Sequence, residues 1–115
     1  MENKDIALLA AKTLSDKKAF DVLVIDIMEK APFADYMVIA TGGSDRQVEA
    51  LVDYVEDALA KEEVLVKHIE GKASGWILMD FGDIIVNVFT QEQREKYNIE
   101  KIWGDCTFLD LEEEK

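Results

Sequence analysis

The order of apolar and polar residues along the first part of the chain predicts one helix and a pair of strands. Apolar residues repeat at helical spacing from Ile6 to Leu14, and the pattern stops at residues 16–18. Residues 20–27 and 36–41 are rich in branched side chains, which favour strands. Pro32, a residue that central strands exclude, lies between them, so we expect a connecting loop and a hairpin.

A second helix is predicted from residue 44 onward by its start signal and its apolar stripe. Ser44 and Gln47 have the spacing of a capping box, in which each side chain bonds a backbone N–H at the other residue. The apolar residues that follow at helical spacing are Val48, Leu51, Val52, Val55 and Leu59. The acidic residues on the opposite face are Glu49, Asp53, Glu56 and Asp57. We interpret this face as a solvated helix exterior rather than a docking surface, because most charge runs are solvated.

Two very apolar segments joined by a turn form the most informative part of the chain. Residues 65–69 predict a third strand, and residues 76–81 and 84–89 predict an antiparallel pair around Gly82-Asp83. Residues 84–89 scarcely alternate between apolar and polar, so both faces of this strand must be covered. The cover is either the protein's own helices or another molecule.

The last predicted element is a short helix. Thr90 and Gln93 repeat the capping-box spacing, and the helix is expected to end near Asn98. The apolar residues expected to fold back on the sheet after it are Ile99, Ile102 and Trp103. The whole order predicts an α/β fold with a mixed five-stranded sheet and flanking helices.

Length and charge favour one domain and a basic protein partner. The 115 residues are 49% apolar, so we expect a single domain over residues 1–110 and an acidic tail at 111–115. The net charge of −12 disfavours direct binding to nucleic-acid phosphates and to anionic membranes. A partner with a basic surface would instead be attracted.

The chain carries no sequence signal for export or membrane insertion. Residues 1–5 have neither the apolar core of a signal peptide nor the character of a transit peptide. No apolar run approaches the roughly 18 residues that span a bilayer. The single cysteine, Cys106, cannot form an internal disulfide. We therefore expect a cytoplasmic setting.

The apparent catalytic motifs do not combine into an active site. Asp80-Phe81-Gly82 matches the metal-binding tripeptide of protein kinases, but the other kinase motifs are missing. Gly42-Gly43-Ser44 lies where a strand meets a helix and could hold phosphate, yet no carboxylates alternate on a nearby strand to hold metal. His68 and Cys106 are interpreted as structural. We expect no catalytic residue, metal or cofactor; a metal-dependent nucleotidyl transferase that uses the Gly42-Gly43-Ser44 turn is the alternative.

The aromatic residues give a better indication of function than the catalytic motifs do. Trp76, Leu78 and Asp80 share one face of their strand by the period-two rule. The other face is entirely apolar and is expected to be the core. Asn87 is expected to lie beside Trp76 across the hairpin, which gives a mixed apolar and acidic patch suited to a basic protein surface. That the chain's own ends cover Trp76 is an equally weighted alternative.

Several segments together resemble a known family. They are Asp35 to Gly42, Ser44 with Gln47-Val48, Ile69-Glu70-Gly71, Trp76 with Asp80 to Asp83, Ile84 to Phe89, and Arg94 with Tyr97, Glu100 and Trp103. In this order and spacing they are similar to the ribosomal silencing factors, also called the Iojap-related family. The resemblance implies a nucleotidyltransferase-like fold without catalytic carboxylates.

The resemblance also implies a function and a partner. Members of the family bind the fourteenth protein of the large ribosomal subunit, keep the small subunit from joining, and lower translation when nutrients are scarce. The resemblance further implies a homodimer when the factor is free of ribosomes. This chain has Asn87 where the family usually has His.

The expected binding site combines the resemblance with the Trp76 patch. We expect Trp76 and Leu78 at the centre of the patch, with Asn87 beside them. The carboxylates expected to pair with basic side chains around the rim are Glu70, Asp80 and Asp83. An acidic adaptor for some other basic protein is a further alternative.

Overall fold

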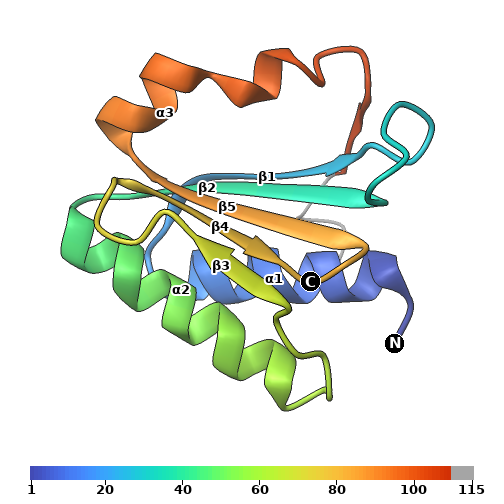
Figure 1. The fold of residues 1–115 in the computed structure, drawn as a ribbon, viewed down its shortest axis with the longest axis horizontal. Coiled ribbons are helices and arrows are strands. Elements are labelled where there is room, and N and C mark those ends of the chain that lie inside the picture. Colours follow the sequence, from blue (N-terminus) through green and yellow to red (C-terminus); the bar gives the residue numbers. More distant parts are fainter. Residues whose placement is uncertain (110–115) are drawn as a thin grey trace.

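The computed structural model describes residues 1–109, in which one six-stranded sheet lies between helices on both sides (Figure 1). The acidic tail expected at 111–115 lies outside the described residues. The elements in chain order are α1 (Asn3–Asp16), β1 (Phe20–Asp26), β2 (Tyr36–Gly42), α2 (Asp45–Ala60), β3 (His68–Glu70), β4 (Trp76–Asp80), β5 (Ile84–Thr90), α3 (Gln91–Tyr97), the 3-10 helix η1 (Ile99–Lys101) and β6 (Thr107–Phe108). No helix within residues 1–109 has the length and apolarity to cross a bilayer.

The sheet is mixed, as the sequence predicts, and its strand order is β3-β4-β5-β2-β1-β6. The two predicted hairpins, β1 with β2 and β4 with β5, are antiparallel. At the centre, β2 and β5 run parallel in an unbroken register from Tyr36 opposite Ile84 to Gly42 opposite Thr90. This central pair joins the two hairpins into one sheet.

Two details of the sheet differ from the prediction. The sheet has a sixth strand, because Thr107 and Phe108 pair with the end of β1. Two residues are too few for an alternating pattern to indicate a strand. The third strand begins at His68 rather than at residue 65, since the side chain of Leu65 is 70% exposed and offers the sheet no apolar contact.

One face of the sheet is covered by α1 and α2, which lie side by side beneath it (Figure 1). The apolar stripe predicted for α2 is buried there together with Leu14 of α1 and Val38 of β2. The Ser44 hydroxyl accepts a hydrogen bond from the Gln47 backbone N–H at 3.1 Å, which confirms the predicted cap. The Gln47 side chain returns to the N–H of Gly43, one residue earlier than in the standard capping box.

The other face is covered by α3 and by the segment that follows it (Figure 1). Phe89 and Ile39 are fully buried there, and Trp103 folds back over them as predicted. Ile102 does not, because 58% of it is exposed. The chain itself therefore provides the cover that the apolar character of β5 requires.

A surface ion pair ties this covering segment to the loop between β1 and β2. The Lys30 ammonium contacts Oδ1 of Asp105 and donates to the carbonyl of Ile102 at 3.1 Å. The hydrogen bond from Lys30 holds the pKa of the Asp105 carboxyl below its ordinary value. Because both groups are in water, the pair orients the segment but contributes little stability.

The cap of α2 provides a direct test of this fold. Ser44→Ala removes the acceptor for the Gln47 N–H, and we expect the free energy of unfolding to fall by about 1 kcal/mol. Urea denaturation measures the loss. Ser15→Ala, at an exposed position inside α1, is the matched control and should leave stability nearly unchanged. Equal effects of the two substitutions would contradict the assigned cap.

Candidate functional site

The strand register brings most of the predicted site residues together on the face of the sheet that carries α3. Glu70 pairs with Leu78, and Leu78 pairs with Asn87. Trp76 and Asp80 flank Leu78 on the same face of β4. We call the exposed and half-buried members of this group, Glu70, Trp76, Leu78 and Asp80, the Trp76 surface.

Trp76 is half-buried at the centre of this surface. Its ring stacks on Phe89, with centroids 4.9 Å apart and planes at 26°, and touches Tyr97 of α3 at 4.8 Å and 46°. The indole N–H donates to Oδ1 of Asn87 at 3.0 Å. The expectation that the chain's own segments cover Trp76 is therefore correct in part. Phe89, Tyr97 and Asn87 hold the ring, and part of it stays accessible.

Asn87 lies beneath the indole rather than at the surface. Only 1% of it is exposed, so a partner protein cannot reach it in this arrangement. Its carbonyl oxygen orients Trp76, while its Nδ2 has no hydrogen-bond partner among residues 1–109. Asn87 thus supports the site from below, a role different from the contact role expected for it.

The three predicted rim carboxylates differ in their surroundings. Glu70 is exposed and pairs with the His68 imidazole at 2.9 Å. Asp80 is half-buried, and its Oδ1 accepts from the Gly82 N–H at 2.7 Å. Asp83 is exposed in the turn beyond the two strands, where its backbone carbonyl accepts from Asp35 and its side chain stays in water. Glu70 and Asp80 therefore form the rim of the Trp76 surface, and Asp83 lies beyond its end.

Tyr97 extends the Trp76 surface from α3, a position that the strand patterns do not predict. It belongs to α3, contacts Trp76 and is 49% exposed. The period-two rule cannot relate a helix residue to a strand. Two signals point to it: Tyr97 is among the residues that resemble the family, and the cap at Thr90, whose hydroxyl accepts from the Gln93 N–H at 3.4 Å, fixes where the helix begins.

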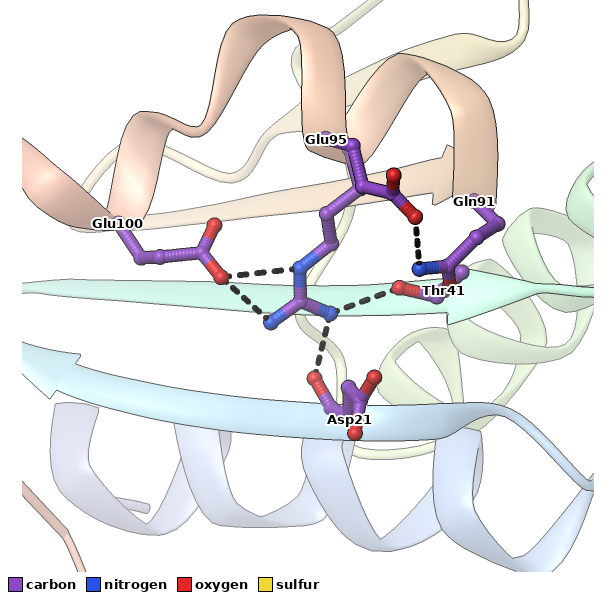
Figure 2. Close-up of polar contacts among 6 residues, drawn as sticks. Asp21, Thr41, Gln91, Glu95 and Glu100 are labelled. Carbon is purple, nitrogen blue, oxygen red and sulfur yellow. Dashed lines mark hydrogen bonds and ion pairs between the residues drawn. The ribbon is translucent and has the colours of Figure 1, made fainter.

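A pocket of about 440 Å³, lined mostly by polar and charged residues, lies between α3 and β1. Arg94 forms part of its wall and is buried. The Arg94 Nη1 donates to the carbonyl of Asp21 and to the Thr41 hydroxyl, and its Nε and Nη2 donate to one oxygen of Glu100 at 3.2 and 3.1 Å (Figure 2). Arg94 therefore links α3 to β1, to β2 and to η1.

The turn that could have held phosphate is occupied by its own side chains. The N–H of Gly43 is bonded by Gln47, and the Ser44 hydroxyl caps α2. A Cβ at Gly42 would lie 3.1 Å from Val48 and 3.2 Å from Leu51, so this glycine allows close packing of β2 on α2. Among residues 1–109 no three His, Cys, Asp or Glu side chains gather so as to hold a metal ion. The turn serves to start the helix.

Comparison with known proteins gives consistent results. The family model described as "Ribosomal silencing factor during starvation" matches residues 1–115. "Ribosomal silencing factor RsfS" of Bacillus subtilis is 39% identical over 113 residues, covering 97% of this chain and 96% of that protein. "Mitochondrial assembly of ribosomal large subunit protein 1" of Mus musculus is 35% identical over 111 residues, covering 92% of this chain and 48% of that protein. A crystal structure of a Chromobacterium violaceum protein superposes with a TM-score of 0.87 at 36% identity, covering 90% of this chain and 88% of that one.

The bonds of Arg94 can be tested at Thr41. Thr41→Val keeps the shape of the side chain but removes the acceptor for Nη1, so a buried charged donor loses a partner. We expect the free energy of unfolding to fall by about 1 to 3 kcal/mol. Thr13→Val in α1, where the hydroxyl only bonds the carbonyl of Leu9 in the preceding turn, is the control and should change stability much less. Urea denaturation of both variants measures the change in the free energy of unfolding. If Thr41→Val left it unchanged, the hydrogen bond from Arg94 to Thr41 would not contribute to stability.

Proposed function

Because this chain belongs to the family of ribosomal silencing factors, we propose that it binds the large ribosomal subunit and keeps the small subunit from joining. In this proposal the contact is made with a basic ribosomal protein at the subunit interface, the fourteenth protein of the large subunit. Binding represses translation when nutrients are limiting, in the cytoplasm, and the free factor is a homodimer. The family description, which refers to starvation, and the name of the mouse relative, which refers to the large subunit, support this proposal.

The observation that carries the proposal is a half-buried indole bordered by carboxylates. Stable interfaces have an aromatic and apolar centre and a polar rim. Trp76 supplies such a centre together with Leu78 and the exposed part of Tyr97. Glu70 and Asp80 supply a rim of negative charge. A surface of this composition fits a cationic protein.

The charge of the whole chain acts in the same direction. At −12 the protein repels the phosphates of ribosomal RNA and attracts a basic ribosomal protein. The repulsion disfavours binding to exposed RNA elsewhere on the subunit, and the attraction speeds the encounter with the intended site. Charge therefore contributes specificity, while the aromatic centre contributes affinity.

Blocking subunit joining requires bulk rather than chemistry. The folded chain measures 32 × 31 × 27 Å. Atoms in contact approach to about 4 Å, so a body of this size on the interface holds the two subunits far out of contact. A rigid sheet with helices on both sides suits this role, and no bond needs to be made or broken.

The central aromatic residue can be tested by truncation. Trp76→Ala should weaken binding to isolated large subunits by about 2 kcal/mol, or roughly thirtyfold, in a co-sedimentation assay. Tyr54→Ala is the control, because Tyr54 is an exposed aromatic residue of α2, on the opposite side of the sheet. Thermal unfolding of both variants checks that they are folded. If Trp76→Ala bound as tightly as the wild type, the indole would not be the anchor.

The acidic rim can be tested with two substitutions that change net charge equally. Glu70→Lys places a cation beside the Trp76 surface, and Glu49→Lys places one on the exposed face of α2. We expect Glu70→Lys to weaken large-subunit binding roughly fivefold or more at low salt, with the loss shrinking as salt rises. Glu49→Lys should have a smaller effect, because it alters only the overall attraction. Equal losses would show that net charge matters and that the rim does not.

A further inference from the structure

The short helix α3 is held on the sheet in an unusual way. Of its seven residues, all within the described part of the chain, only Arg94 is buried. Most helices in globular proteins bury an apolar stripe, and a helix this short is not stable alone. The placement of α3 therefore depends largely on the polar bonds of one side chain, together with the caps at its two ends and the ring contact of Tyr97 with Trp76.

The bonds of Arg94 fix the helix from three directions. Nη1 donates to the Asp21 carbonyl of β1 and, at 2.8 Å, to the Thr41 hydroxyl of β2, and the fork of Nε and Nη2 grips Glu100. A planar guanidinium can satisfy all of these acceptors at once, whereas a lysine ammonium cannot reproduce the fork. These acceptors all belong to the chain itself, so the role of Arg94 is internal.

Tyr97 lies one helical turn beyond Arg94 and faces the Trp76 side of α3. Its ring contacts Trp76 at a centroid distance of 4.8 Å. The Asn98 N–H bonds the Arg94 carbonyl at 2.8 Å, in a left-handed cap with φ 45°, so residues 94 to 98 move as a unit. Arg94 and Tyr97 lie three residues apart, on neighbouring parts of the helix surface, so a shift of Arg94 shifts Tyr97 with it.

We propose that Arg94, with Thr41 and Glu100, is a positioning residue of the docking surface: it fixes α3 so that Tyr97 and Trp76 present one preformed aromatic surface. This inference rests on the proposed function for its binding readout. A preformed surface binds more tightly because less side-chain and helix freedom is lost when the partner arrives. Arg94 itself touches no partner.

The geometric part can be tested without ribosomes. In a Trp103→Phe background Trp76 is the single indole, and acrylamide quenching reports its accessibility. We expect Arg94→Lys to raise the quenching constant, since Tyr97 is released from the ring. Arg46→Lys, the same substitution at the chain's other arginine, exposed on α2, should leave quenching unchanged. Unchanged quenching in folded Arg94→Lys would overturn the proposal.

The functional part can be tested by a double-mutant cycle with isolated large subunits. Arg94→Lys should weaken binding about tenfold in the wild-type background and less than about twofold in the Tyr97→Ala background, because the same contact is already lost. Equal losses in both backgrounds would overturn the proposal. If Arg94→Lys does not fold, Glu100→Gln replaces it, because this substitution removes the charge of the acceptor but keeps one oxygen for Arg94. The expected losses of binding in the two backgrounds, and the result that would overturn the proposal, are the same.

The two parts separate failure of this inference from failure of the proposed function. If the wild-type protein did not bind large subunits, the proposed function would be wrong, and quenching would still decide whether Arg94 positions Tyr97. If the wild type bound but the losses were additive, the proposed function would stand and the role of Arg94 would be limited to stability.

Discussion

The parallel pairing of β2 and β5 is the constraint on which the rest of the structure depends. Both strands are buried along almost their whole length, so neither face of the central sheet can be left to water. Parallel strands need a crossover, and α2 provides it on the face that α1 shares. The opposite face is then closed by the short stretch from α3 to Trp103, together with Ala31 and Ala34 of the segment between β1 and β2.

The two covers are built on different physical principles. The α1 and α2 side is closed by a continuous apolar core, whose contacts are non-directional. The α3 side has a smaller apolar cluster that includes Trp103, and α3 itself is held on it by the hydrogen bonds of Arg94, which are directional. The limited cover ends at Trp76, and the partly open indole is a direct result of that limit. Because the segment that covers this face is short, Trp76 stays partly exposed and is available to a partner.

Much of this arrangement is local in the sequence and could be predicted from it. Helix caps at Ser44 and Thr90, the two hairpins and the face shared by Trp76 and Leu78 all depend on residues a few positions apart. The features that the sequence does not predict connect distant residues: Arg94 lies 53 positions from Thr41 and 73 from Asp21. Contacts between residues so far apart produce no periodic pattern or local motif in the sequence. The burial of Asn87 was hidden for the same reason, since the cover above it comes from another element.

The ends of the sheet carry a further consequence. The outermost strands are β3, with three residues, and β6, with two, and the exposed side chains along them are His68, Glu70, Thr107 and Phe108. Edge strands this short offer little free backbone on which a neighbouring polypeptide could extend the sheet. Fibrous growth by strand addition is thereby discouraged, and any pairing between copies has to use side-chain surfaces instead.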